Sequence, residues 1–139
     1  MARRVSGKMK KNLKTPNYIP GSCNIGTAEV RRRKNFAILG SVFSVSSYLL
    51  LIFIQPPREV RLFIFLPLLL TTLGWLQVRR GFCLAFGIGG AFNFGNLGDA
   101  TRIHRAVDRA ADRKMVIKLA GQAALVAGIL TLFAYLIPK

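Results

Sequence analysis

Three side chains in this sequence could bind a metal ion: Cys23, Cys83 and His104. Two thiolates and an imidazole, joined by a fourth ligand, form a common zinc-binding set. The three residues lie far apart in the sequence, however, and the chain has no Cys-x-x-Cys pair. We therefore expect no metal or other cofactor and two reduced structural cysteines, with reversible acylation or another thiol role as the alternative.

The sequence lacks the usual residues of acid–base or nucleophilic catalysis. It has one histidine and five acidic residues, and every acid lies among basic residues, so no Ser-His-acid triad or carboxylate pair can be proposed. Gly87, Gly89 and Gly90 do not form a phosphate-binding loop, because no lysine followed by serine or threonine comes after them. We expect a protein that is not an enzyme.

Hydrophobic residues make up 52% of the 139 residues, although the formal net charge is +16. The apolar residues form blocks and the charges lie between them, as in a small polytopic membrane protein. A helix needs roughly 17 to 25 apolar residues to cross a bilayer. Residues 36–54, 62–78 and 119–137 satisfy this requirement, so we predict an all-α integral membrane protein with three transmembrane helices. The first apolar run begins too late for a cleavable secretory signal.

Basic residues flank these spans unequally. Residues 1–34 contain ten and residues 79–118 contain eight, whereas the connection 55–61 contains two. Because cytoplasmic segments carry the excess of lysine and arginine, we predict a plasma (inner) membrane protein with a cytoplasmic amino terminus and an external carboxy terminus. An organellar membrane remains open. The residues expected to meet anionic lipid headgroups are Arg31, Arg32, Arg33, Lys34, Arg79 and Arg80.

The amino-terminal tail, residues 1–34, divides into parts of different composition. Residues 16–26 contain two prolines and two glycines beside apolar side chains, which predicts defined turns docked on another part of the protein. A short helix should follow, with Thr27 as its N-cap and Glu29 in its first turn. Tyr18 is the only aromatic residue of the tail, so nucleic-acid binding is not expected.

Residues 81–95 are apolar, yet this segment is too short and too rich in glycine to span a bilayer as a helix. We predict a Gly/Phe-rich hairpin that is re-entrant or interfacial, or is packed against the helices, with its bend at Gly87, Gly89 and Gly90. Residues 98–118 should then form a charged amphipathic cytoplasmic helix, continuous with the third span, in which Asp112 can meet Arg109.

Small residues repeat at helical spacing in two spans and predict helix contacts there. The spans contain no acidic, basic or histidine side chain, which disfavours a proton relay. The expected packing residues are Gly40, Ser44 and Ser47 in the first span and Ala120, Ala124 and Gly128 in the last.

Three functions fit these patterns. The first is a non-catalytic accessory or interaction subunit of a membrane complex, whose partners are other membrane protein subunits or further copies of the chain. The second is a small oligomeric channel or carrier in which backbone carbonyls of the Gly-rich hairpin line the path. The third is a protein that binds anionic lipid headgroups at the membrane surface.

Overall fold

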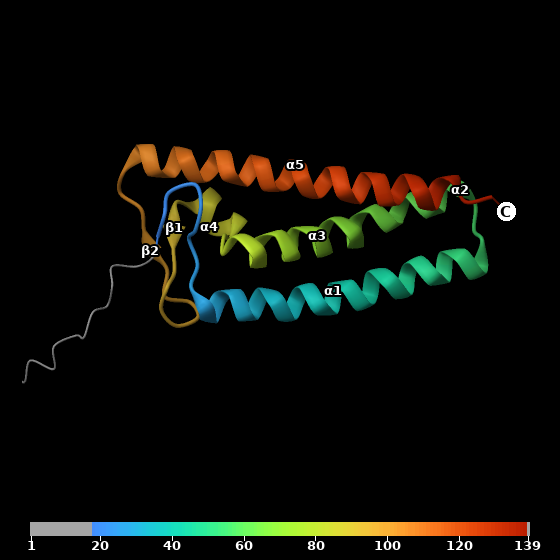
Figure 1. Cartoon of the computed structure of the whole chain (residues 1–139), viewed down its shortest axis with the longest axis horizontal. Helices are drawn as coiled ribbons and strands as arrows, with labels where there is room; N and C mark the ends of the chain where they lie inside the picture. Colours follow the sequence, from blue (N-terminus) through green and yellow to red (C-terminus); the bar gives the residue numbers. More distant parts are fainter. Residues whose placement is uncertain (1–17, 139) are drawn as a thin grey trace, which may run out of the picture.

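Three long helices dominate the computed structural model, which describes residues 18–138 (Figure 1). They are α1 (Thr27–Ile54), α3 (Phe65–Arg80) and α5 (Ala106–Leu136). Helix α2 (Arg58–Arg61) and a 3-10 turn, η1 (Leu62–Ile64), lead directly into α3. Within the described residues, the segments Thr27–Ile54, Arg58–Arg80 and Ala106–Leu136 are long and apolar enough to cross a membrane. The prediction of a mostly helical protein with three such segments is confirmed.

Helix α3 packs against α1 through small side chains. A Cβ atom added to Gly74 would lie 3.1 Å from the Ala37 Cβ, and one added to Gly40 would lie 2.9 Å from the Thr71 Oγ1. The Ser44 hydroxyl forms a 2.9 Å hydrogen bond with the Thr71 hydroxyl. Of the small residues expected to pack in the first span, Gly40 and Ser44 therefore contact α3, and Ser47 is partly buried.

Helix α5 packs on the opposite side of α3. Its seam differs from the predicted stripe of Ala120, Ala124 and Gly128: Ala124 is exposed, and nothing lies within 4 Å of a Cβ atom added to Gly128. Residues 120, 124 and 128 each follow a buried residue by one position, so the predicted stripe lies on the neighbouring side of the helix. The buried face consists of Asp112, Leu119, Ala123, Ala127, Thr131 and Ala134.

Arg61 secures the end of the molecule where α2 meets the last turn of α5 (Figure 1). Its guanidinium donates to the carbonyls of Pro56 (3.1 Å), Ala134 (3.3 Å) and Ile137 (2.6 Å). The sequence placed Arg61 in a connection at 55–61, whereas the structure places it at the end of α2 with 1% of its surface exposed. The carbonyls at the carboxyl end of a helix lack hydrogen-bond donors within the helix, and the Arg61 guanidinium supplies such donors here.

The opposite end carries a compact cap, formed by residues 18–26 and 81–105 with the first turns of α1 and α5 (Figure 1). It contains α4 (Leu84–Gly89) and the strands β1 (Ala91–Phe92) and β2 (Thr101–Arg102). The strands pair antiparallel, with Ala91 opposite Arg102 and Phe92 opposite Thr101. The chain is therefore not purely helical, since it includes this small sheet.

The cap corrects three predicted boundaries. The first is the helix expected from residue 98, which starts at Ala106 because residues 101–102 pair with β1. The second is the bend expected at Gly87 to Gly90, which falls at Gly90 alone (φ 68°), since Gly87 and Gly89 are helical. The third is the N-cap of α1, which is Gly26 rather than Thr27.

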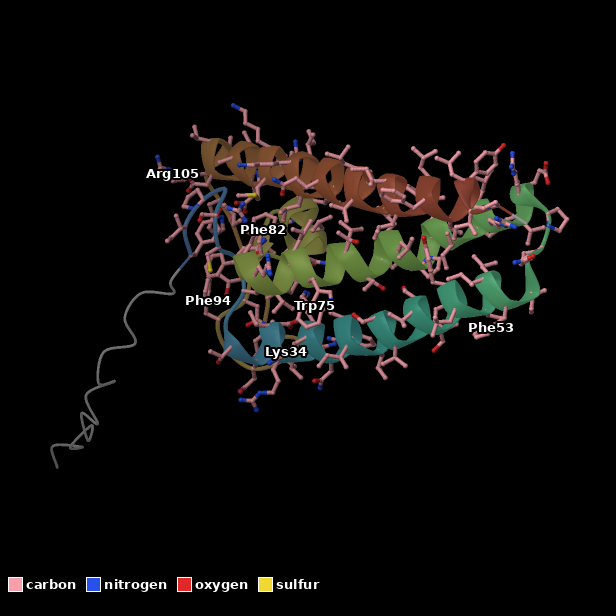
Figure 2. The ribbon with its side chains drawn as sticks, turned by 45° about the vertical axis from the view of Figure 1, so that its right-hand side comes forward. Lys34, Phe53, Trp75, Phe82, Phe94 and Arg105 are labelled. Carbon is pink, nitrogen blue, oxygen red and sulfur yellow. The ribbon has the colours of Figure 1, made fainter. Side chains whose placement is uncertain are left out.

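Most of the span surface faces outward. In the most apolar window of each span, 11%, 17% and 22% of the residues are buried inside the protein. Figure 2 shows Lys34 near the cap end of α1 and Phe53 near the other end, where Phe53 is 83% exposed. Helices α1 and α5 pack against α3, and the three helices thus leave wide apolar faces exposed, which can contact lipid or other helices.

Candidate functional site

Asn24 ties the amino-terminal segment to the chain that leaves α3. Its side-chain amide donates to the Cys83 carbonyl (3.1 Å) and accepts from the Cys83 N–H (2.6 Å). The backbone N–H groups of Asn24 and Ile25 both donate to the Gly81 carbonyl at 3.1 Å. Asn24 has no exposed surface, so these hydrogen bonds take the place of hydrogen bonds to water. They join two segments of the chain that are 59 residues apart.

Asn93 connects the same segment to β1 and α1. Its N–H donates to the Asn24 carbonyl (2.9 Å), and its carbonyl accepts from the Gly26 N–H (2.7 Å). The Asn93 side chain donates to the Glu29 carboxylate at 3.2 Å. The backbones approach so closely that a Cβ atom on Gly26 would lie 2.9 Å from the Phe94 Cα, which explains why glycine occupies this N-cap.

A buried acid, an arginine and a thiol meet where α1 touches α4. Glu29, which is 2% exposed, forms an ion pair with Arg33. The Arg33 guanidinium also lies 2.8 Å from the Cys83 sulfur and 5.8 Å from the centre of the Phe86 ring. Each of these side chains is engaged by another, so the cluster joins α1 to the segment that begins α4.

Asp112 on α5 holds the beginning of the described chain. Its carboxylate accepts from the Gly21 N–H (2.7 Å) and from the Tyr18 hydroxyl (3.0 Å). Burial and this hydrogen bond to a carboxylate raise the pKa of Tyr18 well above its ordinary value, so the phenol stays protonated. The predicted meeting of Asp112 with Arg109 is wrong, because Arg109 donates instead to the carbonyls of Ile103 and His104.

Removing the two contacts of Asp112 should free the segment 18–26. We expect Asp112→Leu to raise the rate of hydrogen exchange at Gly21 by more than about 100-fold, because two partly buried donors lose a charged acceptor at about 1.5–3 kcal/mol each. Tyr18→Phe removes only one of the two bonds, so its effect should be about 10- to 100-fold and smaller than that of Asp112→Leu. Hydrogen exchange measured by mass spectrometry checks that Asp112→Leu has the larger effect, and equal exchange in the two variants would contradict this prediction.

The carbonyl groups of the Gly-rich segment are used inside the cap. Besides the bonds to the Gly81 and Cys83 carbonyls, the Gly90 carbonyl accepts from the Ile103 N–H at 2.8 Å. Gly87 is buried on α4, where a Cβ atom would lie 2.7 Å from a methyl carbon of Val116 on α5. These glycines serve close packing, and their segment's carbonyls accept hydrogen bonds that hold the cap together.

The three candidate metal ligands have different surroundings. Cys83 is buried, Cys23 is half-buried and His104 is exposed in the loop before α5. In the described residues, no group of three or more histidine, cysteine, aspartate or glutamate side chains could hold a metal ion.

An apolar groove of about 770 Å³ runs along the face shared by α1 and α3. Its lining includes Phe36, Gly40, Phe43, Leu70 and Gly74, with Arg33 and Gln77 toward the cap. Of the residues expected to meet headgroups, Arg33 turns into the cap, whereas the others are exposed at this end of the molecule: Arg31, Arg32, Lys34, Arg79 and Arg80.

No protein-family model, characterised protein or solved structure matches this chain. The residues that organise the cap, Asn24, Asn93, Glu29 and Asp112, were not singled out as a site from the sequence. The only signal for the two asparagines was a polar residue set among cysteine, glycine and phenylalanine in CNIG and FNFG. The site is therefore described by its own geometry: a closed polar cap, and an open apolar groove with a basic end.

Proposed function

We propose that this protein is a non-catalytic accessory subunit of a plasma (inner) membrane complex, with its cap on the cytoplasmic side and its carboxy terminus outside. The observation that carries the proposal is the unpartnered outer side of α5. Gly121 and Ala124 are exposed there, and no atom of residues 18–138 lies within 4 Å of a Cβ atom added to Gly121 or Gly128, apart from their own neighbours on the helix. Small residues let two helix backbones approach closely within a bilayer, so this side suits a helix of another subunit.

The cap supports a structural role. Its buried acids, Glu29 and Asp112, and the Cys83 thiol are hydrogen-bonded to other parts of the chain, as expected of side chains that hold a fold together. The cytoplasmic placement of the cap is supported by the basic residues on and beside it, since positive charge is retained on that side of the membrane.

Purification in mild detergent from the membranes that contain the protein tests the proposal. We expect the purified particle to exceed the mass of one chain and to contain a second membrane protein in fixed ratio. A double substitution, Gly121→Leu with Gly128→Leu, should reduce the mass to that of one chain, because the added side chains hold the partner helix away. Light scattering or native mass spectrometry measures this.

The matched control is Ser46→Leu, which adds the same side chain at an exposed position of α1. It should leave the particle unchanged. A particle of one chain for the unmodified protein would overturn the proposal, and a particle made only of identical chains would replace the accessory role by self-association.

A further inference from the structure

We propose that the groove between α1 and α3 binds an acyl chain of an anionic phospholipid, whose phosphate is held by Arg31 and Arg32 at the cap end. This site lies on a different face from the outer side of α5, so the inference does not depend on the accessory role. It also differs from a general attraction of basic residues to the membrane, because it names one groove and two arginines.

The groove has the form of an acyl-chain site. Ala37, Gly40 and Gly74 let α1 and α3 approach closely, and the larger, exposed side chains of Phe43 and Leu70 also line the groove. Its volume of about 770 Å³ lies within the range of about 300–1,000 Å³ that is usual for small-molecule sites. It opens sideways from two spans, where lipid chains lie.

A second hollow, of about 500 Å³, continues the groove toward the cap. Phe36 and Leu39 line both hollows, so the two hollows lie side by side along α1. The second hollow is lined by Arg31, Arg32 and Asn35 as well. The surface of α1 changes from apolar to basic toward the cap, in the same order as a phospholipid changes from acyl chain to headgroup.

Two of the three neighbouring arginines are free to meet a phosphate. Arg33 is engaged by Glu29 and Cys83 inside the cap. Arg31 and Arg32 are exposed, and within residues 18–138 neither has an ion-pair partner. The Arg32 guanidinium lies 6.0 Å from the centre of the Phe36 ring, at the junction of the two hollows. Arginine binds phosphate oxygens through paired, charge-assisted hydrogen bonds.

Charge complementarity favours a lipid over a helix as the occupant. An apolar helix from another subunit would fill the groove but would leave Arg31 and Arg32 without an anion. An anionic phospholipid supplies both the apolar chain and the negative charge. It would occupy the leaflet on the side of the cap.

Binding of a defined lipid to the delipidated full chain, in an uncharged detergent, tests the headgroup contact. Native mass spectrometry would be used to titrate phosphatidylglycerol and phosphatidylcholine. We expect phosphatidylglycerol to bind more tightly, and Arg31→Gln with Arg32→Gln to weaken it by about tenfold or more. The deacylated headgroup, glycerophosphoglycerol, should bind far more weakly, because it cannot use the groove.

The matched control is Arg79→Gln with Arg80→Gln, which removes the same charge from exposed arginines that do not line either hollow. Its effect should be less than about threefold. Equal weakening by the two double substitutions would overturn the proposal in favour of diffuse attraction, and equal binding of the deacylated headgroup would overturn the role of the groove. Gly121→Leu with Gly128→Leu should leave lipid binding unchanged, so this result can succeed or fail separately from the accessory role.

Photocrosslinking identifies the occupant in the membrane itself. Leu70, which is 70% exposed and lines the groove, would be replaced by p-benzoylphenylalanine (Leu70→p-benzoylphenylalanine), with Leu50 on α1 as the control position outside it. We expect phosphatidylglycerol adducts at position 70 that depend on Arg31 and Arg32, and adducts at position 50 that do not. A polypeptide adduct at position 70, from another protein or a second copy of the chain, would overturn the proposal.

Discussion

Replacing Asn24 by alanine is expected to raise the rate at which Cys83 reacts with a maleimide by about 30-fold or more. The Asn24 side chain satisfies both the N–H and the carbonyl of Cys83 inside the cap. Each buried backbone group left without a partner costs about 1–3 kcal/mol. The two groups together cost at least about 2 kcal/mol, and about 1.4 kcal/mol corresponds to a factor of ten in an equilibrium, so opening of the cap should become about 30 times more frequent or more.

The thiol of Cys83 is a direct reporter, since it is 2% exposed in the closed cap. The assay uses the full chain with Cys23→Ser, so that one thiol is measured, and labelling follows the fraction of open molecules when opening is fast. Asn96→Ala is the control: its side chain is exposed and makes no hydrogen bond with any described residue, so its rate should change less than about twofold. A similar rate for the two variants would show that Asn24 does not hold the cap closed.

The second large effect is expected at Gly26, where alanine should raise the same labelling rate by about 10- to 100-fold. A methyl group there would lie 2.9 Å from the Phe94 Cα, which belongs to the backbone and cannot rotate away. Moving the backbone at Gly26 away from the backbone at Phe94 would weaken the 2.7 Å hydrogen bond from the Gly26 N–H to the Asn93 carbonyl. Overpacking of this kind costs about 1–3 kcal/mol.

Gly89→Ala provides the comparison for Gly26. Gly89 also lies in the cap, but no atom lies within 4 Å of a Cβ atom added to it. Alanine should be accepted there, with labelling of Cys83 within about twofold of the starting rate. If both glycine substitutions opened the cap equally, the close approach of Gly26 to Phe94 would not be what limits this position.

The sequence predicted the long helices well because their signal is local. Nineteen uncharged residues at 36–54 can be recognised without knowing what they contact, and the same holds for 62–78 and 119–137. The exact starts and ends were less accurate. The helix predicted from residue 98 begins at Ala106, because pairing of residues 101–102 with β1 outweighs their local preference.

The contacts within the cap could not be predicted, because they join residues that are distant in the sequence. Asn24 meets Cys83 across 59 residues, and Tyr18 meets Asp112 across 94. A local rule pairs Asp112 with Arg109, its neighbour on the helix, and this pairing is wrong. Arg61 illustrates the same difficulty: an arginine in a short connection suggests a solvated charge, yet it caps the carboxyl end of α5.

Cysteine labelling from the two sides of the membrane tests most directly whether α5 crosses the membrane, which the topology of three crossings requires, and so separates the cap from the carboxyl end of α5. The exposed residues Ala100 and Pro138 would be replaced one at a time, by Ala100→Cys and Pro138→Cys, in a chain carrying Cys23→Ser and Cys83→Ala. We expect an impermeant maleimide to label position 138 in intact cells and position 100 only after permeabilisation. Labelling of both positions from the same side would contradict the three crossings and, with them, the placement of the cap.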